Sequence, residues 1–299
     1  MLLCSLDIAH ETILRHEGGL TTLCVALVCP LRDSKQFAVC IVNVGDSLAF
    51  VFSRKHGVRE ITTGSHDIKA ERNIRDAGGA LGPVNDQDPE LHNLTCSMTF
   101  VDPGDIVYLT TDGISDNFDP VVTKIAAAKT RKPRVASGSD APSADEGDGL
   151  QTEGDGSEIE DDAPVDPGEL EDGKPVMAPH ERHQYAVKEM ERIIHEFELF
   201  TESPCSAQEL CGALLQHVLK LTDPKRKVLE NPKLYGRKLK PKDRECRDKE
   251  IVAKLSKSPG KLDHATIIGY EVGCYHGNED EDYCVDEEEE EEVVNAYYL

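Results

Sequence analysis

Apolar runs separated by polar turns are the first guide to the fold of this chain. Five runs rich in β-branched and other apolar residues predict strands: 22–29, 37–44, 47–52, 106–111 and 265–272. The first two are almost continuously apolar, so we expect them in a sheet that is covered on both faces or packed against a second sheet. Gly45-Asp46 joins the second run to the third, and this dipeptide predicts a tight hairpin turn.

Two later segments have the period of amphipathic helices. Apolar residues recur every three or four positions in 185–200 and again in 208–221. Ser206 precedes the second segment and Glu209 follows three residues later, which predicts a capping box. Strands and helices are therefore segregated along the chain rather than alternating, and this order is typical of a layered α+β fold.

Acidic residues are concentrated in two segments that have few large apolar side chains. Residues 140–173 hold 14 Asp and Glu and no Lys or Arg, and residues 279–292 hold 11 acids. We expect both segments to be disordered, because neither can bury enough apolar surface to offset chain entropy. They account for the net charge of −24, and the rest of the chain is about neutral. A nucleic-acid-binding surface across the whole protein is therefore not expected.

A basic stretch lies between the second helical segment and the last strand. Residues 224–261 contain 14 Lys and Arg against 5 acids. One interpretation is a solvated loop. The other is a surface that attracts a phosphorylated substrate or folds back on the acidic segments. The sequence alone leaves both open.

The ten cysteines indicate a reducing compartment. They form no Cys-x-x-Cys pair and show no zinc-ligand spacing, and several lie inside apolar runs. We therefore expect a cytoplasmic or nuclear protein. The apolar run at the start is too short for a signal peptide, and no run approaches the length that spans a membrane.

Three aspartates occupy similar positions next to predicted strands. Asp46 lies in NVGDS, Asp112 in TTDGIS and Asp263 in KLDHAT. Taken alone, Asp112-Gly113 is an ordinary turn dipeptide. However, strand ends of one sandwich can converge, and converging carboxylates repel each other unless a cation lies between them. Such oxygen ligands favour Mg²⁺ or Mn²⁺.

Five motifs in order resemble those of the metal-dependent protein serine/threonine phosphatases, the type 2C or PPM family. They are EGGLTT (17–22), NVGDSLAFVF (43–52), HDIKAERNIRDAGGALG (66–82), YLTTDGISDNF (108–118) and LDHATIIGYEV (262–272). The resemblance covers roughly 10–125 and 183–272, and it is closest to the shorter, divergent branch of the family.

The resemblance implies an α+β fold in which two antiparallel sheets form a sandwich flanked by helices. It also implies a site for two Mg²⁺ or Mn²⁺ ions, at which a metal-activated water attacks the phosphorus directly. By position, Asp112 and Asp263 match metal ligands of the family, and Asp46 matches a ligand of an additional, weaker ion. His264 stands where the family usually has Asn. No catalytic group beyond these ligands and no substrate-binding residue is assigned.

The family motifs that precede EGGLTT have no counterpart here. They are an acidic ligand on an early strand, an Arg that meets the substrate phosphate, and an Asp-Gly-His-Gly-Gly-like motif. We therefore expect a phosphatase domain without its N-terminal part, divided into a first part, an acidic disordered insert, a closing part with the basic loop, and an acidic tail: 1–128, 129–182, 183–273 and 274–299.

Three functions are compatible with this sequence. The first is a protein serine/threonine phosphatase that is incomplete in this chain. The second is an inactive pseudophosphatase that binds phosphoproteins or regulates a partner, and the third is an acidic adaptor. The expected partner is a phosphoprotein rather than a nucleic acid or a membrane, and the oligomeric state is left open. His180-x-x-His183 has the look of a metal pair, but we interpret it as a solvated helix start.

Overall fold

The computed structural model describes most of the two parts predicted to fold. The described residues are 2–68, 76–85, 87–128, 170–171, 173–198, 205–232 and 241–273. The acidic tail and almost all of the acidic segment 140–173 lie outside these residues.

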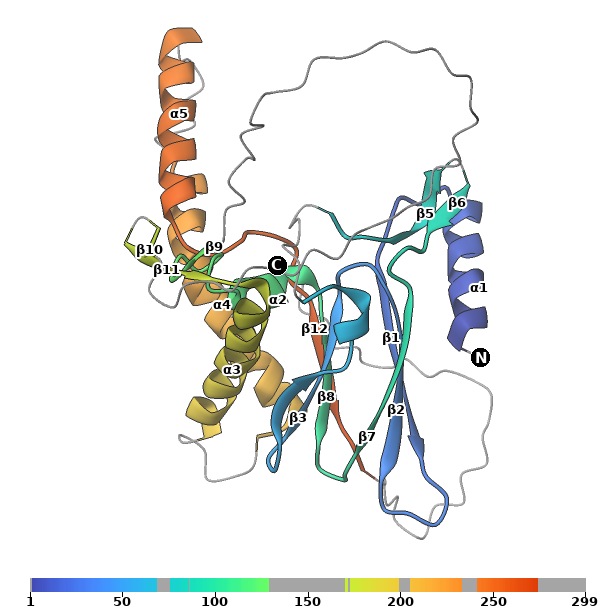
Figure 1. The fold of residues 1–299 in the computed structure, drawn as a ribbon. Coiled ribbons are helices and arrows are strands. Elements are labelled where there is room, and N and C mark those ends of the chain that lie inside the picture. The colour runs from blue at the N-terminus through green and yellow to red at the C-terminus, as the bar shows by residue number, and fades with distance from the viewer. Residues whose placement is uncertain are drawn as a thin grey trace, which may run out of the picture.

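Two antiparallel sheets form the centre of the molecule (Figure 1). The first sheet has the order β1 (Leu23–Pro30), β2 (Phe37–Val44), β7 (Thr95–Val101). The second has the order β12 (Ile267–Glu271), β8 (Ile106–Thr110), β3 (Leu48–Ser53), β4 (Gly57–Glu60). Val39 and Ile41 of the first sheet share one buried core with Val51, Val107 and Leu109 of the second. The sheets therefore pack face to face as a sandwich.

Helices cover the sandwich from both sides. On the second sheet lie α3 (Pro179–Glu198) and α4 (Ala207–Leu229), whose Ile194 and Leu214 pack against Phe50 and Tyr108. On the first sheet, α1 (Leu2–Arg15) buries Leu6 in a smaller core. The predicted α+β sandwich flanked by helices is thus confirmed.

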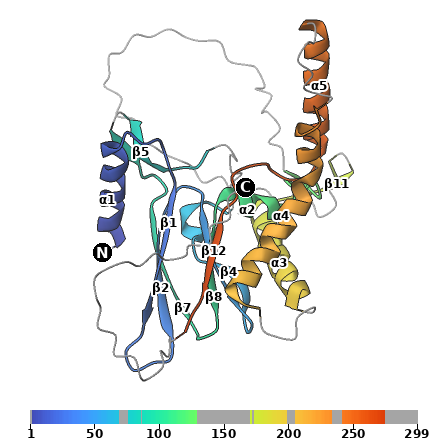
Figure 2. The same cartoon turned by 180° about the vertical axis from the view of Figure 1, so that it is seen from behind.

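Shorter elements complete the structure. They are η1 (Thr63–Ser65), β5 (Ala80–Asn85), β6 (Asp88–Glu90), α2 (Asp112–Ser115), η2 (Asp116–Phe118), β9 (Ala127–Ala128), β10 (Leu170–Glu171) and β11 (Lys174–Met177). Seen from behind, α1 and the α3–α4 pair lie on opposite sides of the strands (Figure 2). Within the described residues, no helix has both the length and the apolar character needed to cross a bilayer.

The predicted hairpin at Gly45-Asp46 is wrong. β2 pairs with β1 and β7, whereas β3 pairs with β4 and β8, so this turn carries the chain from one sheet to the other. Gly45 has φ +98°, and a Cβ there would overlap the side chain of Thr22. Asn93 accepts a hydrogen bond from Gly45 N (3.0 Å) and donates one to Gly45 O (2.9 Å). These bonds satisfy the backbone N–H and C=O groups of Gly45, so β2 and β3 need not pair with each other.

Regular structure also extends into segments expected to be irregular. The end of the predicted insert 129–182 contains β11, which pairs with β9, and the first turn of α3, where buried Arg182 pairs with Asp119 at 2.6 Å. The basic stretch contains the end of α4 and all of α5 (Pro241–Lys257) rather than a loop alone. In α5, the pairs Glu245–Lys249 and Glu250–Lys254 have the i,i+4 spacing that supports a helix. The predicted capping box of Ser206 and Glu209 is confirmed.

Candidate functional site

The three predicted aspartates reach one edge of the second sheet. β8 is the central strand here, and Thr110 at its end pairs with Leu48 of β3 and with Ile267 of β12. Asp112 follows β8 directly and begins α2. In these antiparallel registers, Asp46 before β3 and Asp263 before β12 extend to the same edge. Carboxylates from three separate parts of the chain therefore lie at the same end of these strands.

Backbone packing fixes the loop of Asp263 against the turn of Asp112. Thr111 N donates to Thr266 O (3.0 Å), and Thr111 Oγ1 accepts from Thr266 N (3.0 Å) and donates to His264 O (3.1 Å). The two segments approach so closely that a Cβ on Gly113 would overlap the carbonyl group of His264. This close approach explains why glycine follows Asp112.

Asn117 fastens the same two segments from the buried side. Its side chain is fully buried; Nδ2 donates to Gly113 O (2.8 Å) and to Lys261 O (3.0 Å), while Oδ1 accepts from Lys261 N (2.7 Å). All of these polar atoms are satisfied in a low-dielectric environment, so the connection is rigid. It places Lys261 beside the carboxylates.

The ammonium group of Lys261 lies among three carboxylates. Nζ contacts Asp112 Oδ2, Asp116 Oδ2 (2.9 Å) and Asp263 Oδ2 (3.1 Å). Burial opposes the charge on Lys261, but the hydrogen bonds and negative charges of Asp112 and Asp116 outweigh burial and raise its pKa. We call Asp112, Asp116 and Asp263 the carboxylate cluster. The three carboxylates of the cluster therefore favour a positive charge at the position of Lys261 Nζ.

The sequence predicted part of this cluster. The structure brings Asp112 and Asp263 together, while Asp46 reaches the same edge from the β2–β3 turn; all three stay predicted metal ligands. Asp116 and Lys261 were missed. Asp116 follows Asp112 by four residues, the spacing of one helical turn, and Lys261 precedes Asp263 by two, the spacing that places residues on one face of an extended chain. His264 has a side chain that is 97% exposed.

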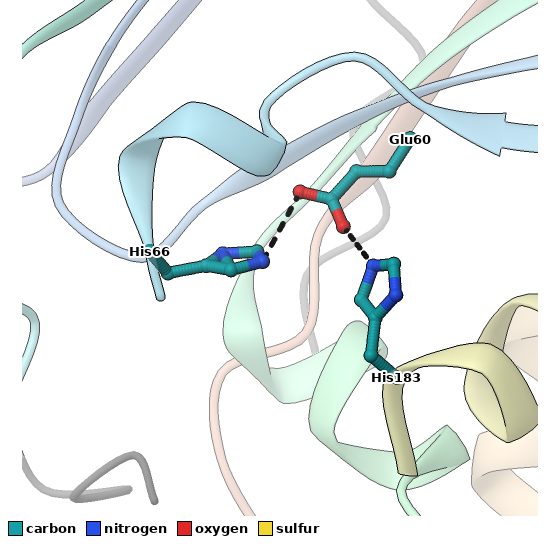
Figure 3. Close-up of side chains that lie close together, drawn as sticks. All are labelled: Glu60, His66 and His183. Carbon is teal, nitrogen blue, oxygen red and sulfur yellow. Dashed lines mark hydrogen bonds and ion pairs between the residues drawn. The ribbon is translucent and has the colours of Figure 1, made fainter. Parts of the chain in front are cut away.

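A pocket of about 300 Å³ adjoins the cluster, between the second sheet and α3. Asp116 belongs to its lining together with Asp119, Arg182, His66 and His183. The two imidazoles converge on the carboxylate of Glu60, as Figure 3 shows, and these three side chains have the geometry of a metal-binding group. The His180-x-x-His183 segment was interpreted as a solvated helix start; this holds for His180, which is exposed, whereas His183 contacts Glu60.

Comparison with known proteins identifies a relative that covers most of the chain. A PP2C-like domain-containing protein of Drosophila melanogaster is 34% identical over 337 aligned residues. The chain is a homologue of this PP2C-like fly protein. The predicted family resemblance is thereby confirmed. The alignment includes 91% of this chain and 48% of the fly protein, so the chain spans about half the length of that PP2C-like relative. No protein-family model matches the chain.

Two solved structures share a weaker similarity with this chain. Both are of the phosphatase domain of the cell fate determinant SpoIIE from Bacillus subtilis, and both are 10% identical to the chain. The manganese-presoaked structure has a TM-score of 0.33, and the other has 0.26; 91% of this chain aligns with 67% and 75% of them, respectively. At these scores the similarity carries no argument, and the fold rests on the strand pairings described above.

Proposed function

We propose that this chain supplies part of a metal-dependent protein phosphatase that hydrolyses phosphoserine and phosphothreonine. The observation that carries the proposal is the convergence of Asp112, Asp116 and Asp263 on one positive charge, in a homologue of a PP2C-like fly protein. A cluster of carboxylates at a sheet edge is suited to holding hard cations next to a phosphate ester.

The donor set of the cluster fits a divalent ion. Three carboxylate oxygens surround one point, and oxygen ligands of this kind suit Mg²⁺ or Mn²⁺. Asp112, Asp116 and Asp263 would hold the ion once the ammonium group of Lys261 swings aside. A second ion, to which Asp46 would contribute from the same edge, stays a prediction of the family resemblance.

Two residues next to the carboxylate cluster, Thr111 and Asn117, hold its carboxylates in fixed positions. A bound divalent ion supplies an activated water and neutralises the charge of the phosphoryl group. Thr111 and Asn117 keep the two halves of the cluster in register, because their hydrogen bonds join the Asp112 turn to the Asp263 loop. Electrostatic catalysis depends on such preorganised groups, since they need no reorganisation during the reaction.

Replacing one ligand tests the proposal directly. We expect Asp112→Asn to lower Mn²⁺-dependent hydrolysis of a phosphopeptide by about a hundredfold or more, because the substitution removes a negative charge from the cluster. The measurement is phosphate release, with and without Mn²⁺ or Mg²⁺, by the purified protein joined to a segment that supplies the family motifs not found in this chain.

Asp33→Asn is the matched control. Asp33 is exposed in the β1–β2 turn and has φ +58°, a conformation that Asn adopts readily. The control variant should retain full turnover. Equal activity of the two variants, or hydrolysis without any divalent ion, would contradict the proposal. Phosphopeptide binding without turnover, unaffected by Asp112→Asn, would instead support the pseudophosphatase function.

The expected substrate and compartment belong to the same proposal. A phosphoprotein is the partner that this chemistry requires, and neither a nucleic acid nor a membrane is proposed. A cytoplasmic or nuclear location is supported by the cysteines, since all eight in the described part of the chain are free thiols.

A further inference from the structure

A buried glutamate between two histidines lies outside the carboxylate cluster. The side chain of Glu60, at the end of β4, is only 1% exposed. Its Oε2 lies 2.7 Å from His183 Nε2, and its Oε1 lies 3.6 Å from His66 Nε2. Within the described part of the chain, its ion-pair partners are these two histidines and no Lys or Arg. A buried carboxylate is costly unless it is paired, so this group needs an explanation.

The three side chains come from separate elements and point at one another. Glu60 ends β4, His66 follows η1, and His183 lies near the start of α3 (Figure 3). One ligand atom from each lies within 4.8 Å of the others. The two rings are tilted by 59° with their centroids 6.0 Å apart, so they approach the carboxylate from different directions. The two rings are therefore not stacked in parallel, and each presents a nitrogen to the carboxylate.

We propose that Glu60, His66 and His183 form a binding site for a zinc-class divalent ion. Two imidazole nitrogens and one carboxylate oxygen are the ligand set that Zn²⁺ accepts, whereas Mg²⁺ requires mostly oxygen ligands. Metal–ligand distances of about 2.0–2.2 Å place tetrahedral ligand atoms roughly 3.3 Å apart. One ligand atom from each of the three residues already lies within 4.8 Å of the others, so side-chain rotations that shorten the longest separation would complete the coordination.

Thr62 supports the carboxylate from behind. Its Oγ1 donates to Glu60 Oε1 (2.7 Å) and accepts from Ala49 N (3.1 Å), and Thr62 is fully buried. A hydrogen bond of this kind fixes the direction of a ligating carboxylate, as partners around known metal ligands do. The carboxylate is therefore oriented by the second sheet before any ion arrives.

The pocket side of the group remains available for a fourth ligand. His66 and His183 both line the pocket next to the carboxylate cluster. With neutral imidazoles, the group carries one negative charge, and a divalent ion would leave one positive charge facing the pocket. A water or an anionic group can complete the coordination there. The ion would also tie α3 to the second sheet, because His183 is on the helix and Glu60 is on the sheet.

Direct binding of the metal tests this site without any enzyme assay. The purified chain is freed of metal with a chelator and titrated calorimetrically with Zn²⁺ alone. We expect one site per chain whose affinity falls at least about tenfold in His183→Asn and in His66→Asn. His180→Asn is the matched control, since His180 is exposed one turn earlier on the same helix. Its affinity should equal that of the unmodified chain.

Co²⁺ as a probe separates this site from thiols and from the carboxylate cluster. We expect the visible absorption of four-coordinate Co²⁺ without a thiolate charge-transfer band. The signal should persist in Asp112→Asn and disappear in His66→Asn. The site would be overturned if the unmodified chain bound no Zn²⁺, if a thiolate band appeared, or if His66→Asn and His183→Asn bound Zn²⁺ as tightly as the unmodified chain. Because no turnover is measured, this result is independent of the proposed phosphatase activity.

Discussion

At the scale of single residues, Lys261 has the greatest influence on the candidate site. Its ammonium group contacts all three carboxylates of the cluster. The same contacts that raise its pKa would attract a divalent ion, so lysine and metal compete for one place. A family resemblance cannot reveal this competition, because it depends on a residue outside the matched ligand positions.

Removing the competing charge should strengthen metal binding. Lys261 places a positive charge at the point where the ion would bind, and its pKa is raised because the carboxylates favour that charge. We therefore expect Lys261→Met to raise the Mn²⁺ affinity of the cluster in calorimetric titration, by about tenfold for each 1.4 kcal/mol of repulsion removed. Lys257→Met, on the exposed surface of α5, should leave it unchanged. A lower or equal affinity in Lys261→Met would show that the ammonium does not block the ion.

The pH dependence of this competition follows from the sign of the shift. A lysine with a raised folded-state pKa gives its full stabilisation below its unfolded pKa of about 10.4 and loses it only as the pH rises through the folded value. Lys261 therefore stays charged between about pH 6 and 9, a range that lies below even the ordinary pKa of lysine. Raising the pH within that range should not relieve its competition with Mn²⁺.

At the scale of elements, the sequence predicted the strands that are most deeply buried. β2 and β8 have continuous apolar runs and match their predicted ranges closely. β7 was missed although its residues alternate between polar and apolar, as in a half-buried strand; unusually, its apolar Met98 and Phe100 are the exposed ones. The Gly45-Asp46 turn was also misjudged. When both flanking strands are buried on both faces, their pattern does not tell a hairpin from a crossing between sheets.

The contact between α2 and the chain entering β12 can be tested through Gly113. A Cβ at this position would overlap His264 backbone atoms, which cannot rotate away. We expect Gly113→Ala to destabilise the protein by about 1–3 kcal/mol, measured by urea unfolding. Gly212→Ala is the control, because nothing lies near a Cβ in this part of α4 and alanine favours a helix. A loss of stability in the control but not in Gly113→Ala would refute this packing.

At the scale of the whole molecule, two layers of helices enclose two layers of strands unevenly. α3 and α4 bury one face of the second sheet, whereas Leu27, Met98 and Phe100 of the first sheet are exposed. Only part of the candidate sites could be predicted from the sequence. Asp112 and Asp263 were predicted because each lies in a short sequence motif. Glu60, His66 and His183 meet across more than a hundred residues, and no spacing rule anticipates such a meeting.

The attachment of α1 to the first sheet rests on a small core. Leu6 is 3% exposed and packs in a cluster with Val42, Val44 and Leu81. We expect Leu6→Ala to lower the free energy of unfolding by about 2–3 kcal/mol, because the substitution leaves a cavity. Leu3→Ala, at a side chain that is 50% exposed on the same helix, should cost less than about 0.5 kcal/mol. Equal losses in urea unfolding would mean that α1 is not docked through Leu6.

The hydrogen bonds of Asn117 have a consequence for the rate of ion exchange. They hold the backbone of Lys261 on both its N–H and its carbonyl group, so the flexible side chain is the part that can move. Loop motions take nanoseconds to microseconds, and exchange at this cluster needs no such motion. Entry of a divalent ion would instead require the Lys261 side chain to leave its three carboxylate partners, so the strength of those contacts would set the rate.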